Sequence, residues 1–184
     1  MVGVLALQGD FEKHRIVLDS LNVENTYVKN ARNLDKINAL IIPGGESTTL
    51  SMLIDRYGLR ESIVEFSKKF SIFGTCAGMI VLAGSLIDER PEPLHLMDIE
   101  VSRNAFGAQV DSFESFIPVK HIGHSKIRAV FIRAPVVTKV GKNVEIMAKL
   151  DNGIPVCVRD QNMLATAFHP ELTEDNRIHQ YFVD

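Results

Sequence analysis

A cysteine between two glycines is the first feature of this sequence whose spacing suggests chemistry. Cys76 lies in the stretch 74–78 (Gly-Thr-Cys-Ala-Gly), between an apolar run that ends at Phe73 and another that begins at Met79. This order predicts a strand, a tight turn and a helix, as in a nucleophile elbow. The partial positive charge at a helix N-terminus favours a thiolate. The pattern therefore predicts Cys76 as a nucleophile, although a cysteine is more commonly a small buried apolar residue.

Two further residues could complete a catalytic set with this cysteine. A cysteine nucleophile needs a base, and the base needs an orienting group. His169 and Glu171 follow the apolar run 163–168, with Pro170 between them. In an extended backbone, residues i and i+2 point the same way, so the two side chains are expected to meet. We predict His169 as the base and Glu171 as the residue that orients it.

A glycine pair follows another apolar run. Residues 43–49 (Pro-Gly-Gly-Glu-Ser-Thr-Thr) come directly after the buried-strand pattern 39–42. Gly44 and Gly45 allow the backbone to present an N–H group to an oxyanion. The stretch also fits a plain strand-to-helix connection with Ser47 or Thr48 as the helix N-cap. Both interpretations can hold together.

These stretches give the chain a clear resemblance to a known family. The chain resembles the triad-type glutamine amidotransferases and, more narrowly, the glutaminase subunit of pyridoxal 5'-phosphate synthase. Ala77 supports the narrower match, because most amidotransferases of this type carry another residue after the cysteine. The motifs that carry it are Leu7-Gln8-Gly9-Asp10, residues 43–49, residues 74–79, Arg103-Asn104 with Gly107 and Gln109, Ile132-Arg133-Ala134-Pro135, and His169-Pro170-Glu171.

The resemblance implies an activity and roles for individual residues. Cys76, His169 and Glu171 would hydrolyse L-glutamine to L-glutamate and ammonia through a glutamyl thioester. The backbone N–H groups of Gly45 and Ala77 would form the oxyanion hole. The substrate-binding residues that it implies are Gly45, Glu46, Ser47, Arg103, Ile132 and Arg133. No metal and no cofactor is implied for this chain.

The resemblance also implies a partner. The sequence contains neither a P-loop nor a G-x-G-x-x-G motif, so the chemistry that uses the ammonia is expected on another polypeptide. In the family, a barrel-shaped synthase subunit makes pyridoxal 5'-phosphate from ribose 5-phosphate and glyceraldehyde 3-phosphate. We expect docking of that subunit to switch the oxyanion hole on by selecting one peptide orientation at Gly45.

The order of elements predicts the fold that positions these residues. Apolar runs at 2–7, 26–28, 39–42 and 71–73 alternate with helical patterns at 11–21, 49–57 and 59–69. This alternation favours an α/β protein with a flavodoxin-like doubly wound, mostly parallel sheet and helices on both faces. Ligands bind beyond the carboxyl ends of such strands. Gln8, the glycine pair and Cys76 are therefore expected at one edge of the sheet.

The second half of the chain predicts a loop and short strands rather than alternating strands and helices. Residues 85–93 are predicted as a loop, followed by strands at 97–101, 113–119, 127–132, 144–150 and 154–159 that form a small antiparallel extension. Asn152-Gly153 predicts a hairpin, and Cys157 is expected to be packed inside it.

Three other histidines are not expected to take part in chemistry. His14 is interpreted as a residue on the surface of a helix, and His121 and His124 as part of an exposed loop. Thr173 is expected to cap a terminal helix with Ile178, Tyr181 and Phe182 on its inner face.

The length, composition and net charge of the chain limit the classes of protein to which it can belong. A chain of 184 residues with 46% hydrophobic and 23% charged residues is expected to be one globular domain, residues 1–184. A net charge of −3 without basic blocks argues against nucleic acid as a partner. Neither a membrane span nor a secretory signal is visible, and the two cysteines do not suggest a disulfide framework. A cytoplasmic location is therefore expected.

Three alternative functions remain open from the sequence. A γ-glutamyl hydrolase or a flavodoxin-like protease would keep the cysteine and histidine but would not need residues 43–49. A glutaminase of another pathway, such as imidazole glycerol phosphate synthesis, is disfavoured by Ala77 and Gln8-Gly9-Asp10. A non-enzymatic regulatory or redox-sensing domain would have no use for a complete Cys, His and Glu set.

Overall fold

Five parallel strands form the larger part of a seven-stranded sheet, from one edge inward. In a computed structural model that describes residues 1–103 and 112–184, their spatial order is β2-β1-β3-β4-β12, which is the flavodoxin-like order. Every residue of β1, β3 and β12 is buried, as expected where helices cover both faces. The predicted fold class is therefore confirmed. The strands are β1 (Val2–Leu5), β2 (Asn25–Val28), β3 (Ala39–Ile42), β4 (Ser71–Thr75) and β12 (Met163–Thr166).

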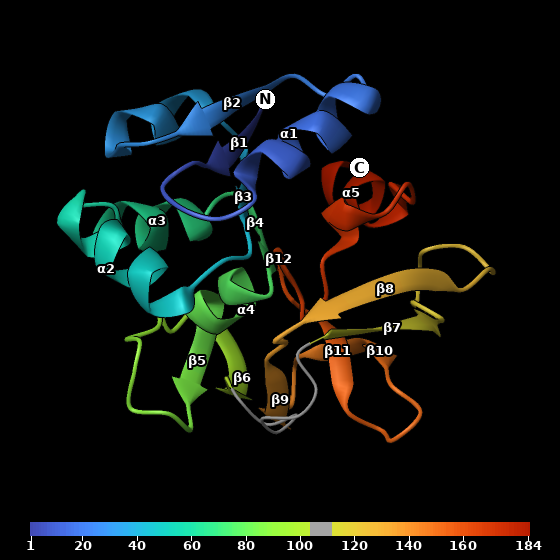
Figure 1. The fold of residues 1–184 in the computed structure, drawn as a ribbon. Coiled ribbons are helices and arrows are strands. Elements are labelled where there is room, and N and C mark those ends of the chain that lie inside the picture. The colour runs from blue at the N-terminus through green and yellow to red at the C-terminus, as the bar shows by residue number, and fades with distance from the viewer. Residues whose placement is uncertain (104–111) are drawn as a thin grey trace.

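Helices lie on both faces of this sheet (Figure 1). One face carries α2 (Ser47–Arg56), α3 (Arg60–Ser67) and α4 (Ala77–Leu82), and the other carries α1 (Phe11–Ser20) and α5 (Arg177–Val183). Two short 3-10 helices are η1 (Ala31–Lys36) and η2 (Pro170–Leu172). This arrangement is the double winding that the alternation of strands and helices predicted.

The helix caps differ from the prediction in two places. Glu46, rather than Ser47 or Thr48, caps α2, because its carboxylate accepts hydrogen bonds from the amides of Thr48 (3.0 Å) and Thr49 (2.7 Å). A carboxylate with two oxygens can satisfy two of the free amides at a helix start, whereas a hydroxyl reaches one. Thr173 does not cap α5, since its hydroxyl donates to the carbonyl oxygen of Pro170 and Asn176 holds the cap position.

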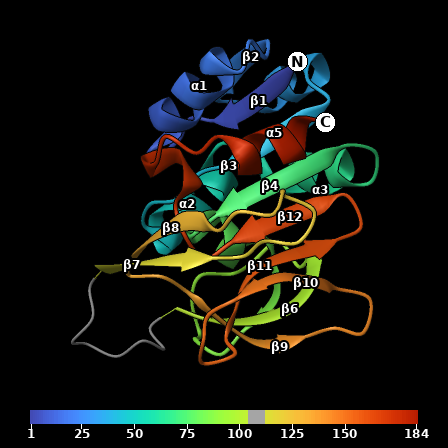
Figure 2. The same ribbon diagram turned by 90° about the vertical axis from the view of Figure 1, so that its right-hand side faces the viewer.

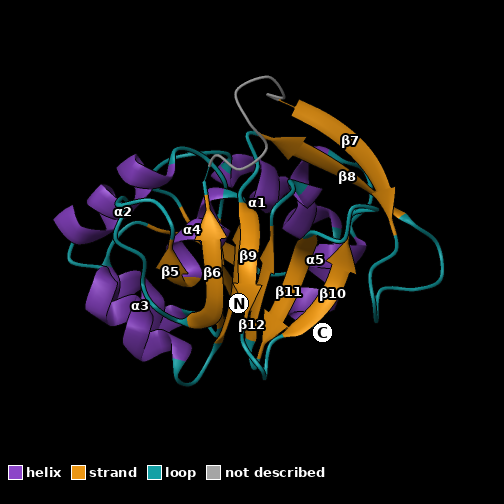
Figure 3. Cartoon of the chain, turned by 90° about the horizontal axis from the view of Figure 1, so that it is seen from below, coloured by secondary structure: helices purple, strands orange, loops and turns teal. Residues whose placement is uncertain are grey.

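The predicted antiparallel extension is confirmed, with two additional strands. β11 (Pro155–Asp160) pairs antiparallel with β12, and β10 (Glu145–Lys149) pairs antiparallel with β11. Figure 2 shows the strands of this sheet following one another from β1 to β10. In Figure 3 the antiparallel ribbon of β7 (Ser112–Ile117) and β8 (Ile127–Ile132) extends to one side of the other strands.

A third sheet contains the two strands that the sequence did not predict. β5 (Ala83–Leu86) pairs parallel with β6 (Met97–Ser102), and β9 (Val136–Val140) pairs antiparallel with β6. β5 follows α4 without a connecting loop, and its Ala-Gly-Ser-Leu sequence has no β-branched residue, so no strand pattern marks it. Asn104, Gly107 and Gln109, which contribute to the resemblance, lie outside the described residues.

The buried side chains of the sheets and helices form one hydrophobic cluster. Phe131 of β8 and Phe168, which follows β12, are both fully buried, and their ring centroids lie 5.6 Å apart. Ile178, Tyr181 and Phe182 of α5 pack against the same cluster, as predicted. The segment that leads into His169 is thus held firmly between β8 and the central sheet.

The described residues contain no helix with the length and apolar character needed to cross a bilayer.

Candidate active site

Cys76 occupies a strained turn between β4 and α4. Its backbone has φ 48° and ψ −103°, which lies outside the regions that residues with a side chain normally adopt. Such a conformation costs about 1–3 kcal/mol and persists only where the surroundings impose it. A Cβ atom on Gly78 would lie 2.1 Å from the carbonyl oxygen of Ile42, so a glycine is required there. The predicted elbow, with glycines where strand and helix approach closely, is confirmed.

His169 and Glu171 meet as predicted, although not through an extended backbone. The Nδ1 atom of His169 lies 2.7 Å from Oε1 of Glu171, and both side chains are buried. Glu171 belongs to η2, a tight turn that begins at Pro170. Proline fixes φ near the helical value, so this turn, rather than strand alternation, brings the carboxylate under the imidazole.

The imidazole of His169 also lies beside Cys76. A Cβ atom added to Gly44 would lie 2.4 Å from Cε1 of His169 and 3.3 Å from Cβ of Cys76, so both side chains border the Gly44 backbone. Burial lowers the pKa of His169, but hydrogen bonds with Cys76 and Glu171 outweigh it and raise the pKa to about 10. Since Nδ1 faces Glu171, Nε2 is the nitrogen left for the sulfur atom. This arrangement favours an imidazolium next to the thiol group.

The residues of the site follow the ends of four neighbouring strands and lie at one edge of the sheet, as predicted. Gln8 follows β1, Gly44 and Gly45 follow β3, Cys76 follows β4 and His169 follows β12. The strand order reverses between β1 and β3, and crevices at such points bind ligands. Oε1 of Gln8 accepts a hydrogen bond from the amide of Glu46 at 3.1 Å, which ties the loops after β1 and β3 together.

Of the two residues predicted to form the oxyanion hole, Gly45 lies in the loop after β3 and Ala77 begins α4 directly after Cys76. Gly45 has φ 148°, which is in the region that favours glycine, and its backbone is exposed. Ala77 is the first residue of α4, so its amide is one of those without an acceptor inside the helix.

Glu46 and Arg103, both predicted to bind substrate, contact each other. Nη2 of Arg103 lies 3.2 Å from Oε1 of Glu46, and Nη1 donates to the carbonyl oxygen of Arg90 at 2.8 Å. Partial burial raises the pKa of Glu46, but hydrogen bonds from Thr48 and Thr49 outweigh it and lower the pKa to about 2. The carboxylate is therefore ionised at neutral pH and is shared between the helix cap and the arginine.

The remaining predicted substrate-binding residues surround the same edge. The carbonyl oxygen of Ile132 lies 3.8 Å from Sγ of Cys76, and the side chain of Ile132 is exposed. Arg133 follows it with φ 44° and is also exposed. Ser47 is buried as the first residue of α2. The six predicted substrate-binding residues are thus divided between the segment after β3, the end of β6 and the end of β8.

One sequence interpretation near the site is wrong. His14 does not lie on the surface of α1 but is completely buried, with Nε2 3.6 Å from Oε1 of Glu171. His179 of α5 is equally buried and contacts His14 at 2.9 Å. The two histidines are 165 positions apart, so no local pattern could have paired them. Their only sequence signal is that both occur on the apolar side of amphipathic helices.

The loop histidines behave differently. His121 is exposed, as predicted, and its Nε2 atom lies 2.9 Å from Oε1 of Glu145. His124 is exposed as well. Within residues 1–103 and 112–184, no group of three or more His, Cys, Asp or Glu side chains could hold a metal ion.

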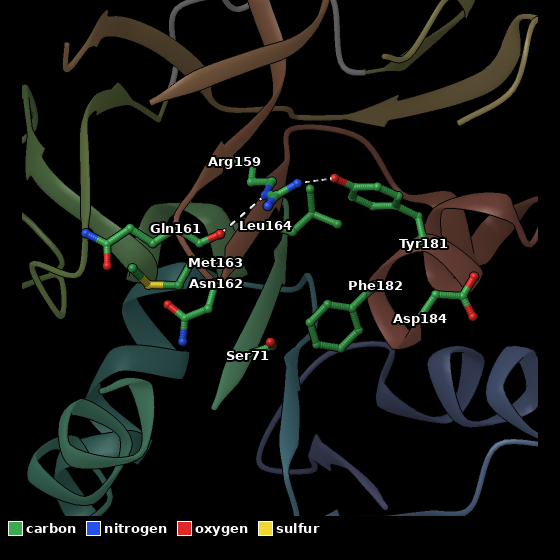
Figure 4. A pocket seen from close by; sticks show the side chains of 9 residues that line it. All are labelled: Ser71, Arg159, Gln161, Asn162, Met163, Leu164, Tyr181, Phe182 and Asp184. Atoms are coloured by element: carbon green, nitrogen blue, oxygen red, sulfur yellow. Dashed lines mark hydrogen bonds between the residues drawn. The ribbon is translucent and has the colours of Figure 1, made fainter. Parts of the chain in front are cut away.

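A pocket of about 330 Å³ lies away from this site. Ser71 and Met163, which begin β4 and β12, line it, so it lies at the amino ends of the strands, opposite the triad. Figure 4 shows Arg159 in this pocket, donating hydrogen bonds to the hydroxyl of Tyr181 (2.6 Å) and the carbonyl oxygen of Gln161 (3.3 Å). Because Cys76, His169 and Glu171 do not line it, the pocket is not part of the candidate active site.

Comparison with known proteins identifies the family. The model of the SNO glutamine amidotransferase family matches residues 4–184. The chain belongs to this family. The resemblance inferred from the sequence motifs is thereby confirmed.

Relatives within the family are similar over nearly their whole length. The chain is 52% identical to the pyridoxal 5'-phosphate synthase subunit PdxT of Dehalococcoides mccartyi strain CBDB1, over 99% of this chain and 95% of the relative. It is 49% identical to the protein of the same name from Oenococcus oeni, over 99% and 94%. A solved structure described as a glutamine amidotransferase is 45% identical, with a TM-score of 0.93 over 99% of this chain and 96% of the other.

Proposed function

We propose that this chain is the glutaminase subunit of a pyridoxal 5'-phosphate synthase and that residues 1–184 form its single glutaminase domain. The observation that carries the proposal is the meeting of Cys76, His169 and Glu171 at the carboxyl edge of a parallel sheet. Membership of the SNO glutamine amidotransferase family supports it. Relatives named as subunits of pyridoxal 5'-phosphate synthase support the narrower assignment.

The first half of the reaction is acylation of the cysteine. The Cys76 thiolate attacks the side-chain amide carbon of L-glutamine, and the carbonyl oxygen becomes an oxyanion. His169, which is protonated beside the thiolate, gives its proton to the amide nitrogen, and ammonia leaves as the C–N bond breaks. The product of this step is a glutamyl thioester on Cys76.

The second half returns the enzyme to its starting state. Neutral His169 takes a proton from a water molecule, whose oxygen attacks the thioester carbon. Cleavage of the C–S bond releases L-glutamate and restores the thiolate. Glu171 accepts the Nδ1–H of His169 throughout, which fixes the tautomer and stabilises the imidazolium.

Backbone amides stabilise the oxyanion in both halves. We assign this role to the N–H groups of Gly45 and Ala77. Ala77 begins α4 directly after the nucleophile, and Gly45 belongs to the loop whose Gly44 backbone borders Cys76. One such donor is worth about 3 kcal/mol of transition-state stabilisation.

Recognition of glutamine requires partners for its α-amino and α-carboxylate groups. The ionised Glu46 suits the ammonium group, and the arginines suit the carboxylate, because a guanidinium can donate two parallel hydrogen bonds. The residues that we assign to substrate binding are Gly45, Glu46, Ser47, Arg103, Ile132 and Arg133.

The ammonia must reach an acceptor before it is protonated. In water near neutral pH ammonia is mostly ammonium, which is not a nucleophile. We therefore infer that the chain delivers ammonia to a barrel-shaped synthase subunit, which makes pyridoxal 5'-phosphate from ribose 5-phosphate and glyceraldehyde 3-phosphate. The subunit names of the relatives support an assembly of this kind.

The test is a product assay with the assembled complex. The two purified subunits are supplied with L-glutamine, ribose 5-phosphate and glyceraldehyde 3-phosphate, and glutamate and pyridoxal 5'-phosphate are quantified. The proposal expects both products, and no pyridoxal 5'-phosphate from glutamine when Cys76 is replaced by alanine. Glutamate release without pyridoxal 5'-phosphate would indicate a glutaminase of another pathway. Faster hydrolysis of γ-glutamyl peptides than of glutamine would indicate a γ-glutamyl hydrolase.

A further inference from the structure

Two buried histidines lie directly behind the candidate triad. His14 of α1 and His179 of α5 are both 0% exposed, and Nδ1 of His14 lies 2.9 Å from Nε2 of His179. The roles proposed above for the triad use neither of them. Buried polar side chains are uncommon unless they are hydrogen-bonded, so this pair needs a physical explanation.

The pair is in contact with the triad through one oxygen atom. Oε1 of Glu171 accepts the hydrogen bond from His169 at 2.7 Å, and Nε2 of His14 lies 3.6 Å from the same oxygen. Nε2 of His14 is also 3.2 Å from the hydroxyl of Thr75, the residue before Cys76. His14 therefore adjoins both the acid of the triad and the strand that carries the nucleophile.

The contacts favour one set of tautomers. If His14 carries its proton on Nε2, an N–H group points at the Glu171 carboxylate and at the Thr75 hydroxyl, and Nδ1 accepts from Nε2–H of His179. Nδ1 of His179, which has no hydrogen-bond partner, is then an unprotonated nitrogen. The opposite tautomers would point a lone pair at the carboxylate and bury an N–H group without an acceptor, which is the costlier arrangement.

The surroundings keep both rings neutral. Phe73, which is fully buried, lies edge-on to both of them, with ring centroids 6.3 Å from His14 and 5.7 Å from His179. Burial lowers the pKa of His14, and burial with the neighbouring His14 lowers that of His179 to about 3. A neutral pair presents an N–H dipole to Glu171 without placing a second positive charge beside His169.

We propose that His14 and His179 are positioning residues, which form a directed hydrogen-bond chain with Thr75 that points the His14 Nε2–H dipole at the Glu171 carboxylate and holds it under His169. The chain runs from His179 Nε2–H to His14 Nδ1 and from His14 Nε2–H to the Thr75 hydroxyl, and it brings that N–H group within 3.6 Å of Oε1 of Glu171. It limits rotation of the carboxylate away from His169 and thereby keeps Nε2 of His169 directed at Cys76. This inference rests on the proposed glutaminase function.

Two substitutions at one position separate positioning from packing. In His14→Gln the amide nitrogen reaches the place of Nε2, so the N–H group that faces Glu171 and Thr75 is kept. In His14→Asn the shorter amide reaches only the place of Nδ1, so the donor is lost. Leu18→Ala, one turn further along the buried side of α1, is the control for loss of packing.

The assay is glutamate release by the assembled complex with the synthase subunit. We expect His14→Asn to lower kcat about tenfold, because the Glu171 carboxylate loses the N–H dipole that faces it, and to change KM less than twofold. His14→Gln should keep at least half of the wild-type kcat. Leu18→Ala should lower the unfolding midpoint in urea but leave kcat unchanged. Equal kcat values in His14→Asn and His14→Gln would overturn the proposal.

A second measurement does not depend on activity. Nuclear magnetic resonance of the full chain with ¹⁵N-labelled histidine reports the tautomer of each ring. We expect neutral Nε2–H tautomers for His14 and His179 at pH 7, and a shift of the His169 Nδ1–H resonance in His14→Asn but not in Leu18→Ala. A Nδ1–H tautomer for either ring, or an unchanged His169 resonance in His14→Asn, would contradict the chain. Wild-type protein that lacks glutaminase activity but shows these tautomers would refute the proposed function and leave the hydrogen-bond chain supported.

Discussion

The two cysteines lie in environments that differ in everything except burial. Cys76 is 6% exposed and Cys157 is 0% exposed, and both are free thiols. Cys157 lies inside β11, with Thr166 of β12 and Ala148 of β10 as its strand partners. Burial raises the pKa of its thiol far above the usual range. Cys76 instead follows a strand, in a turn with φ 48°, beside His169.

This difference shows which features distinguish a nucleophile from a core residue. Residue type and burial are the same, so they carry no information. Three features are found at Cys76 and not at Cys157: a position at the carboxyl end of a parallel strand, a strained backbone between closely packed glycines, and an imidazole beside the sulfur atom. If these features account for activity, substitutions at or beside Cys76 should lower turnover and the same change at Cys157 should not.

The largest contrast is expected from alanine at each cysteine. Cys76→Ala should lower glutamine turnover about a millionfold, the scale on which loss of a nucleophile acts in a comparable triad. Cys157→Ala should keep turnover within about twofold. Glutamate release by the two variants in the assembled complex is the measurement, and circular dichroism controls for folding. A large loss of turnover in Cys157→Ala would show that the environment of a cysteine does not distinguish the nucleophile from the core residue.

The next effect concerns the residue that orients the base. In Glu171→Gln an amide NH₂ or carbonyl group replaces the carboxylate, so the Nδ1–H tautomer of His169 is no longer enforced and its charge is no longer balanced. We expect kcat to fall about 10³- to 10⁴-fold, as with the equivalent change in another triad, while KM changes little. Steady-state kinetics test this. An unchanged kcat would mean that the contact between His169 and Glu171 is only structural.

A smaller effect is expected from the partner. The free chain would waste glutamine if its site were always complete, and Gly45 can change its peptide orientation at little steric cost. If docking restores one oxyanion donor, turnover should rise about a hundred- to a thousandfold when the synthase subunit is added. Glutamate release is measured with and without that subunit. Equal rates would refute gating by the partner.

The smallest effect is a dependence of stability on pH. The pKa of His169 is raised from 6.5 to about 10 in the folded chain, so the stability that it contributes is fully present below pH 6.5. That contribution is lost as pH rises through about 10. Urea unfolding at pH 6.5 and pH 10 should show a larger loss for the wild type than for His169→Gln, with Cys157→Ala behaving like the wild type. Parallel losses in all three would contradict the raised pKa.

Much of the fold could be predicted because local patterns determine it. The buried runs before Gly44 and Cys76 are continuous and short, which is what a strand covered on both faces requires. The close approach of Gly78 in α4 to Ile42 in β3 can be predicted from the sequence, because only glycine fits at position 78. Cys76 and His169 follow the ends of parallel strands, so chain order and the rule for parallel sheets were enough to bring them together, whereas Glu171 reaches His169 through the turn η2.

The interpretations that failed depend on contacts distant in sequence. His14 contacts His179 across 165 positions, and the only local signal is that each lies on the apolar side of its helix. β9 and β5 both pair with β6, so β5 exists through a tertiary contact rather than through its own propensity. Glu46 caps α2 as an acid, where the sequence offered a serine and a threonine with equally good cap chemistry.

The most direct test of the central claim is covalent labelling by a glutamine analogue. The analogue carries a diazoketone in place of the side-chain amide, and peptide mass spectrometry locates the adduct in the assembled complex. The account predicts one adduct on Cys76, protection by excess L-glutamine, and no label on Cys157. An adduct mainly on Cys157, or labelling of Cys76 that L-glutamine does not slow, would contradict it.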